Sequence, residues 1–485
     1  MRQFGTDTAD RHALLWLPAL ACAAVMALVM FGGARAEAAA TRPNVVLILV
    51  DAMRADRLGP YGFTFRNTTP NLNRFAARSA VFENAISQAA WTVPSIATLF
   101  SGVDPQAHRV LSYRSADSGG AIDVLAESNE TIAEQFKRAG YSTHALLKSI
   151  VVDKERGMAQ GFDSFTIVNP KTSQADGPSG SELTDAAITH LKAMQAAGTP
   201  FFTYLHYMDT HSPYKAPEPY YSKYRGSYSG PVTGAHRQME QAYEKGGVVP
   251  TADDIEAMKA LYDADVEYWD SQFGRLMTHI VASGLDPNTI VMVVADHGEA
   301  FWEHGKIFHG EVYQENLQIP FIVKAPGIKA GRYQQWSQLV DAPPTLADLA
   351  GIKKSSLWTG VSHAPSLTGT GAATTAPVYA EYGDLQVIID QTGKKMIVRK
   401  SGNECYDLAK DPKEKASVCT PAEVERLKKL METRVCKARA LAERLKSSGT
   451  ASVDDEQAAQ LAALGYVDPA PGDGKATAAT LGDCD

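Results

Sequence analysis

The chain has 485 residues, of which 45% are hydrophobic and 21% charged, and its formal net charge at pH 7 is -8. This length is enough for one large domain with a sizeable core and a smaller domain beside it. An acidic chain of ordinary globular composition gives no reason to expect a basic surface for phosphate backbones, so we expect no nucleic-acid partner.

Residues 1–36 have the pattern of an export signal. Two arginines precede an apolar run from Leu14 to Phe31, and a small-x-small cleavage site ends at Ala36. A run of about 18 apolar residues can also just span a bilayer, so an uncleaved membrane anchor is the alternative. In either case we expect the rest of the chain outside the cytoplasm, periplasmic, secreted or held at the membrane surface.

The first predicted strand ends in a candidate functional residue. Asn44–Val50 is a continuous apolar run rich in β-branched residues, which predicts a strand buried on both faces of a parallel sheet. Asp51 follows at its carboxyl end, where α/β folds place their ligands. The alternative is that Asp51 only caps the next helix. Farther along, apolar residues at helical spacing predict a helix over residues 69–80.

Residues 90–102 predict a loop that leads into a short helix ending at Gly102. Pro94 suits the first turn of a helix, so we expect Thr92 at the N-cap, facing unpaired backbone N–H groups and the positive end of the helix dipole. That position can stabilise an oxyanion or hold a phosphate or sulfate group. The alternative is that Thr92 only caps its helix.

Two further predicted strands carry candidate residues near their ends. Ser142–Leu147 predicts a strand followed by Lys148, which either faces an anionic substrate or is an ordinary surface lysine. Phe201–Tyr207 predicts another strand, and His211 lies in the loop beyond it. We interpret His206 as a packed sheet residue and His211 as the better candidate for chemistry.

A long irregular excursion follows over residues 215–250, which are rich in Tyr, Gly and Pro. Such loops commonly shape a substrate pocket or act as a lid. Residues 252–282 predict a long helix whose apolar stripe belongs to the core. Thr289–Ala295 then predicts a second fully buried strand, which ends in Asp296 and His297.

The order of these elements predicts the domain organisation. Strands alternate with helices over residues 41–385, which is typical of a doubly wound α/β domain with a mostly parallel sheet. Over residues 386–466, short strands and a charged helix predict a smaller C-terminal α+β subdomain. The Gly-, Pro-, Ala- and Asp-rich residues 467–485 are predicted to be disordered.

Four of the five cysteines lie in the C-terminal part of the chain, namely Cys405, Cys419, Cys436 and Cys484. In an exported protein they can form two disulfides, with three possible pairings. They show no Cys-x-x-Cys spacing, which makes a metal site built from them the weaker interpretation.

The predicted strand ends suggest a different metal site. Asp51, Asp296 and His297 reach one edge of the sheet, close to the helix that begins near Thr92. Two carboxylates, one imidazole and one hydroxyl oxygen suit one divalent cation, Mn, Zn, Mg or Ca. Such a cation would lower the pKa of the Thr92 hydroxyl and polarise an ester under attack.

Motifs along the whole chain, taken in their order, carry a family resemblance. They are Arg42–Asp51, Leu58–Gly62, Trp91–Ser95, Ser101–Gly102, His206–Tyr214, Ala295–Glu299, His309–Glu315, Ile319–Pro320 and Cys405–Pro412. By these motifs the chain resembles the sulfatase branch of the alkaline phosphatase superfamily over nearly its whole exported length. The resemblance implies an alkaline phosphatase-like fold and an ester hydrolase or phosphotransferase.

The same resemblance assigns roles to individual residues. It implies that Asp51, Asp296 and His297 are metal ligands together with Thr92, which occupies the nucleophile position. His211 matches the histidine near the leaving group. His309 and Lys148 match lysines that bind the substrate's anionic group in the family, which implies that both residues contact substrate.

Three departures from the family's pattern modify the implied chemistry. Thr92 stands where an exported sulfatase has a Cys or Ser that is oxidised to formylglycine, Ile96 replaces the arginine of that motif, and Ala52 replaces a second aspartate. We therefore expect no formylglycine. A formylglycine hydrate can expel sulfate by collapsing to its aldehyde, whereas a threonine sulfate has no such exit. A phosphothreonine can be released by water attacking phosphorus, with His211 as acid or base.

These observations predict a metal-dependent hydrolase of phosphoric mono- or diesters, or a phosphotransferase, with Thr92 as the nucleophile. One alternative is a sulfuric ester hydrolase. The other is an inactive sulfatase-fold protein that binds an anionic glycan or lipid headgroup. In each case the expected partner is an anionic phosphate or sulfate group on a lipid, a glycan or a small molecule.

Overall fold

The structure is a computed structural model that describes residues 1, 42–111, 121–170, 177–373, 376–445, 450–452 and 484. The predicted export signal and the predicted disordered tail therefore lie outside the described residues, apart from Met1 and Cys484. Pro43–Asp485 forms one compact unit. Within the described part of the chain, no helix has the length and apolar character needed to cross a membrane.

A large sheet forms the centre of this unit. Its strands are β1 (Asn44–Val50), β2 (Ala80–Ile86), β4 (Ser142–Leu147), β5 (Ser164–Ile167), β6 (Phe201–Tyr207), β7 (Thr289–Val294), β10 (Phe321–Lys324) and β11 (Gly331–Gln338). Their spatial order is β11-β2-β10-β7-β1-β6-β4-β5. Neighbours run parallel except at β10, which is antiparallel to both β7 and β2. The predicted doubly wound, mostly parallel sheet is confirmed.

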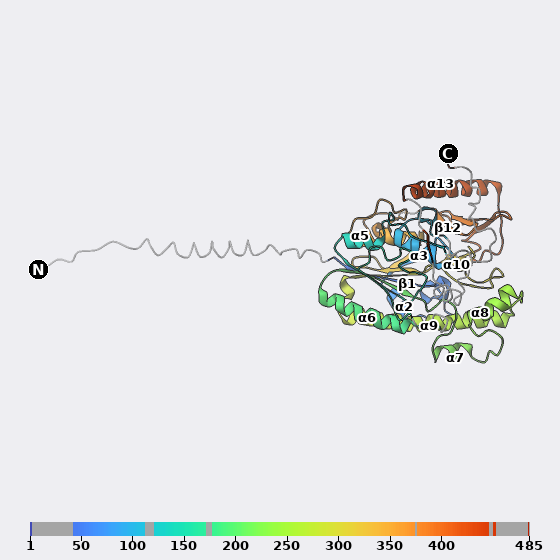
Figure 1. Cartoon of the computed structure of the whole chain (residues 1–485), viewed down its shortest axis with the longest axis horizontal. Helices are drawn as coiled ribbons and strands as arrows, with labels where there is room; N and C mark the ends of the chain where they lie inside the picture. The colour runs from blue at the N-terminus through green and yellow to red at the C-terminus, as the bar shows by residue number, and fades with distance from the viewer. Residues whose placement is uncertain are drawn as a thin grey trace. The chain divides into compact units, whose positions relative to one another are not determined.

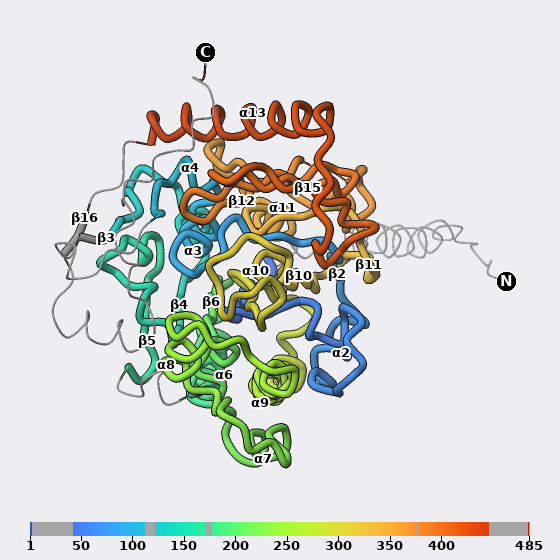
Figure 2. The backbone as a smooth tube through the Cα atoms, turned by 90° about the vertical axis from the view of Figure 1, so that its right-hand side faces the viewer, coloured from blue at the N-terminus to red at the C-terminus, as the bar shows by residue number. Residues whose placement is uncertain are grey.

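Helices cover both faces of this sheet (Figures 1 and 2). They are α2 (Pro70–Ala76), α3 (Thr92–Ser101), α5 (Ile132–Arg138), α6 (Gly180–Ala197), α9 (Ala252–Ala282) and α11 (Ala342–Leu349). Helices α2, α6 and α9 lie on one face, and α3, α5 and α11 lie on the other. With both faces covered, Val45–Val50 of β1 is fully buried. Each such side chain contributes about 1.5–3 kcal/mol of burial free energy.

The helix predicted over residues 69–80 is too long at its C-terminal end. Helix α2 ends at Ala76, and strand β2 begins at Ala80. The strand forms because Val81 pairs with both β10 and β11, which come from far along the chain. Pairing with such distant strands overrides the local helical pattern.

The C-terminal part forms the predicted α+β subdomain. Its strands β12 (Val378–Tyr382), β13 (Leu385–Ile389), β14 (Lys394–Val398) and β15 (Glu404–Asp407) form an antiparallel sheet, and α13 (Pro421–Leu445) packs on it. Since β12 pairs with β13, this sheet begins before position 386, the boundary predicted from the sequence. Of the three pairings left open, the structure shows Cys405–Cys419 and Cys436–Cys484.

The remaining elements are short. They are η1 (Ala55–Arg57), η2 (Gly59–Tyr61), α4 (Pro105–His108), β3 (Ala121–Asp123), α7 (Tyr220–Arg225), α8 (His236–Met239), η5 (Glu240–Lys245), η6 (Asp286–Asn288), β8 (Ala300–Phe301), β9 (Ile307–Phe308), α10 (Gln314–Leu317), η7 (Leu339–Asp341), α12 (Ala364–Thr368) and β16 (Thr450–Ser452). The predicted excursion over residues 215–250 therefore contains α7, α8 and the π-helix η5.

A buried ion pair joins β14 to the loop after β15, and its lysine also reaches the segment before α10. Lys395 Nζ lies 2.5 Å from Glu414 Oε1, with both side chains fully buried, and Nζ also donates to the carbonyl of Val312 at 2.7 Å. Glu414→Gln should lower the free energy of unfolding by about 3–5 kcal/mol, because it leaves the Lys395 ammonium buried without its counter-charge. Chemical denaturation measures this change.

The matched control for that substitution is Lys410→Gln. Lys410 pairs with Asp407 at 3.5 Å, but its side chain is 84% exposed. Removing such a surface pair should change stability by less than about 1 kcal/mol. If Glu414→Gln were as stable as the control variant, the buried pair would not stabilise the subdomain.

Candidate active site

The carboxyl ends of β1 and β7 bring three predicted ligands together. These strands are parallel neighbours in the middle of the sheet, with Leu49 opposite Val294. Asp51, Asp296 and His297 follow them directly, are all buried, and each offers a ligand atom within 4.8 Å of the others. The sequence predicted this placement, and their role as metal ligands stays a prediction.

Each of the two carboxylates has one oxygen held by hydrogen bonds and one without a partner. Asp296 Oδ1 accepts from the backbone N–H of Ala52 at 3.1 Å and of His297 at 2.9 Å. Asp51 Oδ2 lies 3.3 Å from the hydroxyl Oγ1 of Thr92. Among the described residues, Asp51 Oδ1 and Asp296 Oδ2 are buried without any hydrogen-bond partner. Two buried anionic oxygens of this kind fit a cation.

The imidazole of His297 completes this donor set. Its Nδ1 donates to the carbonyl of Gly298 at 2.8 Å, which leaves Nε2 as the ligand atom. Nε2 lies 3.6 Å from Asp51 Oδ1 and 3.4 Å from Asp296 Oδ2. The three side chains therefore fit one divalent cation.

The pKa shifts of these three residues also favour a cation bound between them. Burial raises the pKa of Asp296 far above its usual value, and the neighbouring Asp51 raises it further. Burial opposes ionisation of Asp51 as well, but the hydrogen bond with His206 and the nearby His211 and His297 bring its pKa below the usual range. Burial and the nearby His309 lower the pKa of His297 to about 3, so this imidazole is neutral and able to ligate. Without a cation, only one of the two carboxylates ionises readily.

Thr92 is the first residue of α3, so the predicted N-cap position is wrong by one residue. Trp91 is the N-cap, because its backbone is extended (φ -165°, ψ 164°) and helical geometry begins at Thr92. The Thr92 side chain is fully buried. Its Oγ1 lies 3.3 Å from Asp51 Oδ2 and 3.4 Å from His297 Nε2. The hydroxyl therefore lies both at the positive end of a helix and against the candidate metal ligands.

Two further predicted residues lie next to this cluster. The ring centroid of His309 is 4.4 Å from that of His297 and 5.3 Å from that of His211. His309 Nδ1 lies 3.1 Å from Glu299 Oε1. Burial opposes the charge on His309, but the Glu299 carboxylate raises its pKa above the usual value. His309 is thus suited to contact an anion as an imidazolium.

The net pKa shift of His211 is in the opposite direction. Burial lowers the pKa of His211, and Asp51 offsets only part of this effect. His211 Nδ1 lies 2.7 Å from the carbonyl oxygen of Ser212 and donates to it. The neutral ring therefore carries its proton on Nδ1, and Nε2 is the atom that can accept one.

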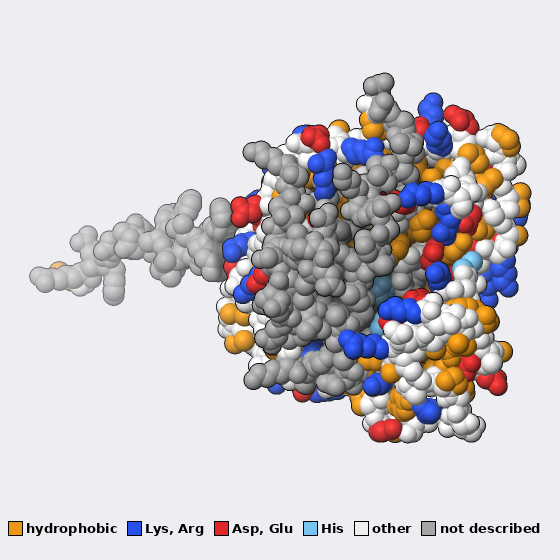
Figure 3. Space-filling model, turned by 45° about the vertical axis from the view of Figure 1, so that its right-hand side comes forward, with side chains coloured by type: hydrophobic (Ala, Val, Ile, Leu, Met, Phe, Trp, Pro, Cys, Tyr) orange, Lys and Arg blue, Asp and Glu red, His pale blue; other side chains and the backbone are white. Residues whose placement is uncertain are grey.

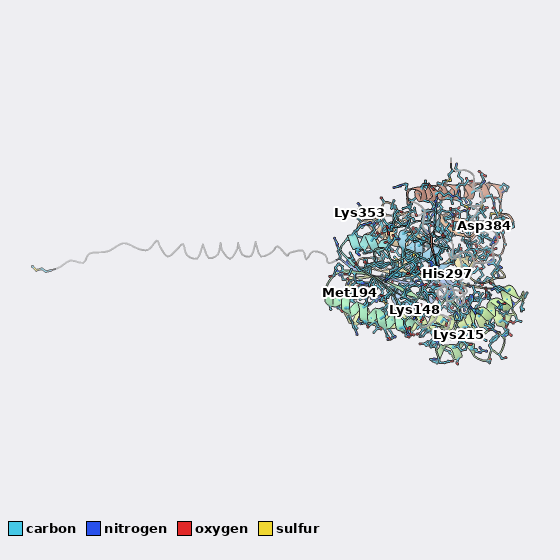
Figure 4. The ribbon with its side chains drawn as sticks, in the orientation of Figure 1. Lys148, Met194, Lys215, His297, Lys353 and Asp384 are labelled. Atoms are coloured by element: carbon cyan, nitrogen blue, oxygen red, sulfur yellow. A yellow bond between two sulfur atoms is a disulfide. The ribbon has the colours of Figure 1, made fainter. Side chains whose placement is uncertain are left out.

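Lys148 is engaged elsewhere in the structure. Its Nζ lies 2.7 Å from Glu182 Oε2 and donates to the carbonyl of Val168 at 2.9 Å. Lys148 follows β4 whereas His297 follows β7, and Figure 4 labels both residues. These contacts direct the ammonium to an ion pair outside the Asp51 cluster. Contact between Lys148 and a substrate stays a prediction.

Sequence reasoning did not single out two residues near the site, Glu299 and His236. Glu299 closes the motif that begins at Ala295, so its place beside a strand end was the available signal. His236 comes from the excursion, stacks on Phe308 with ring centroids 4.1 Å apart, and places Nδ1 2.6 Å from Ser212 Oγ. No motif marks it, because its position depends on how the excursion folds back onto β9.

Figure 3 shows histidine side chains at the surface with Lys and Arg side chains nearby. Burial, followed by the neighbouring His211 and His309, lowers the pKa of His236 to about 3. Lys245 and Arg237 lower it further. Cationic surroundings of this kind favour an anionic ligand.

Comparison with known proteins gives concordant matches. The family model described as Sulfatase matches residues 43–352. The chain is 26% identical to the arylsulfatase of Clostridium perfringens over 440 residues, which cover 77% of this chain and 89% of that protein. It is 24% identical to the choline-sulfatase of Rhizobium meliloti over 433 residues, covering 77% and 81% of the two chains.

A solved structure shows the same fold. The phosphonate monoester hydrolase of Agrobacterium radiobacter matches with a TM-score of 0.64 at 20% identity, covering 85% of this chain and 100% of that one. At this identity the likeness concerns the arrangement of helices and strands.

Proposed function

Because this chain belongs to the sulfatase family, whose members are ester hydrolases, we propose that it hydrolyses an anionic ester at a divalent-metal centre with Thr92 as the nucleophile. The position of Thr92 Oγ1 carries the proposal. This oxygen is buried at the start of α3, 3.3 Å from Asp51 Oδ2 and 3.4 Å from His297 Nε2. A divalent cation held by Asp51, Asp296 and His297 would supply Lewis-acid stabilisation of charge on the ester oxygens.

The surrounding side chains bind the anionic group and transfer protons. In the first step Thr92 Oγ1 bonds to the sulfur or phosphorus atom and the bond from that atom to the leaving oxygen breaks, while the Thr92 proton passes through His211 Nε2 to the leaving oxygen, which departs as the alcohol. His309 binds the anionic group as an imidazolium. In the second step His211 Nε2 accepts a proton from the attacking water, the bond to Thr92 Oγ1 breaks, and His211 returns the proton to Thr92 Oγ1.

A sulfuric ester is the first candidate substrate. The curated relatives are named arylsulfatase and choline-sulfatase. These names support the sulfuric-ester alternative better than the phosphoric-ester function predicted from the sequence. On this proposal the sulfate leaves Thr92 by attack of water at sulfur, because threonine has no aldehyde exit.

A phosphorus ester is the second candidate, and Thr92 itself favours it. Water attack at phosphorus releases a phosphothreonine without any need for an aldehyde. The export-signal pattern of residues 1–36 adds the proposal that either reaction takes place outside the cytoplasm.

A panel of four aryl esters separates these candidates. The metal-loaded protein is assayed with an aryl sulfate, phosphate, phosphodiester and phosphonate, and release of the phenol is measured. We expect the highest kcat/KM on the sulfate, and a preference for a phosphorus ester would select the second candidate. If a folded, metal-loaded protein turned over none of the four esters, the hydrolase proposal would fail.

A further inference from the structure

The two carboxylates of the metal site are held by different kinds of donor. Asp296 Oδ1 is held by two backbone N–H groups, which side-chain chemistry does not alter. Asp51 Oδ2 is held by two side chains, the Thr92 hydroxyl and the His206 imidazole, each at 3.3 Å. The orientation of Asp51, and hence of its unpartnered Oδ1, therefore depends on those two side chains.

His206 is placed for this contact by the sheet. It lies in β6 between β1 and β4, opposite Leu49 on one side and Leu147 on the other, and its side chain is fully buried. The interpretation of His206 as a packed sheet residue is therefore correct but incomplete. Its imidazole also reaches Asp51, which follows the neighbouring strand.

The Asp51 carboxylate, which only accepts, fixes the proton of His206 on Nε2, and Tyr204 supports this tautomer. Residues two apart on a strand share a face, and Tyr204 OH lies 3.0 Å from His206 Nδ1. When the hydroxyl donates to Nδ1, Nε2 carries the hydrogen and donates to Asp51 Oδ2. The other tautomer would place a lone pair of Nε2 against a carboxylate oxygen, which is repulsive.

The proposed reaction makes His206 the more important of the two donors. Thr92 Oγ1 loses its proton when it bonds to the ester, so it stops donating to Asp51. Among the described residues, His206 is then the remaining side-chain donor to Asp51 Oδ2. A carboxylate without it could rotate, and Oδ1 would leave the cation.

We infer that His206 is a positioning residue of the metal centre, which keeps Asp51 Oδ1 directed at the cation before and after Thr92 reacts. Tyr204 supports it by holding the imidazole in the Nε2–H tautomer. The inference rests on the proposed metal-dependent function. It concerns hydrogen bonding to a ligand, and assigns neither residue to the metal itself.

Metal binding to chelator-treated protein tests this role without any substrate. We expect His206→Leu to weaken Mn²⁺ binding by about 10–100-fold in titration calorimetry, the usual cost of losing a hydrogen bond that orients a ligand. His206→Gln retains an N–H donor and should bind Mn²⁺ nearly as well as the wild type. Tyr204→Phe should cause a smaller loss than His206→Leu, since it removes only the tautomer control.

His190→Leu is the matched control. His190 lies on α6 and contacts the same strand, with Nε2 3.1 Å from Thr203 Oγ1, away from the metal site. We expect wild-type Mn²⁺ affinity for this variant. Thermal unfolding of each metal-free variant shows that it is folded.

Three results would overturn the inference in distinguishable ways. If the wild type binds Mn²⁺ and folded His206→Leu binds it equally well, His206 does not position Asp51, while the proposed function stands. If the folded wild type binds no divalent cation, the metal-dependent function fails and the inference fails with it. An equal loss of affinity in folded His206→Leu and folded His206→Gln would show that an N–H donor at this position does not hold Asp51, and would contradict the role assigned to His206.

Discussion

Thr92→Ala is expected to lower kcat by about 10⁴-fold or more at saturating metal, the scale of loss seen when a covalent nucleophile is removed. The substitution takes away a hydroxyl that lies against both Asp51 and His297 at the start of α3. Water cannot take its place at the helix terminus with the same orientation. Steady-state kinetics on the best ester of the panel measures the loss.

Thr92→Ser is the matched control for this experiment, because it keeps the hydroxyl and removes one methyl group. We expect it to retain measurable turnover. Acid quenching of the wild type during turnover should leave a sulfate or phosphate on the peptide that contains Thr92, detectable by mass spectrometry. A fully active Thr92→Ala enzyme would exclude threonine-based covalent catalysis.

Asp296→Asn is expected to remove metal-dependent activity and also to stabilise the metal-free protein at neutral pH. The neutral amide removes the cost, at neutral pH, of either keeping a proton on the buried Asp296 carboxyl or burying a second negative charge beside Asp51. In the wild type, burial and then Asp51 raise the pKa of Asp296. Such a carboxyl costs no stability below its unfolded pKa of about 3.9, and destabilises the fold increasingly as pH rises towards its folded pKa.

Thermal unfolding over a pH series checks both parts of this prediction. Without metal, the melting temperature of Asp296→Asn should exceed that of the wild type at pH 7, and the difference should vanish below pH about 4. With metal at about 100 times its Kd, the wild type should gain about 2.7 kcal/mol and become the more stable protein. Removing the metal with a chelator should make Asp296→Asn the more stable protein again and should abolish turnover by the wild type.

Asp348→Asn is the control for the metal effect, since Asp348 pairs with Lys354 at 2.7 Å at the protein surface. This variant should respond to metal like the wild type. A wild type that none of Mn²⁺, Zn²⁺, Mg²⁺ and Ca²⁺ stabilises would contradict the predicted metal site.

Several elements could be predicted because their cause is local. The apolar runs of β1 and β7 specify strands buried on both faces, and residues that follow such strands meet at one edge of a parallel sheet. These strands therefore predict that Asp51, Asp296 and His297 reach the same edge of the sheet, whereas the pairing of β1 with β7, which makes them neighbours, is a feature of the tertiary structure. The long helix α9 could be predicted in the same way, because its apolar stripe repeats with the helical period.

Other elements could not be predicted because distant segments create them. Strand β2 replaces the end of a predicted helix only through pairing with β10 and β11. The helix bearing Thr92 begins one residue earlier than its proline suggested, because the extended backbone of Trp91 ends the preceding loop. A boundary of this kind depends on packing around the loop as much as on local preference.

By itself, the sequence determined the α/β class, the family motifs and the strand ends that carry the candidate ligands, because hydrophobic periodicity and short motifs are properties of neighbouring residues. Only the tertiary structure decided the partners of these side chains. It directs Lys148 to Glu182, brings His236 from the excursion to Ser212, and joins His206 to Asp51. Such contacts are set by strand register and by how distant segments pack, which no local pattern records.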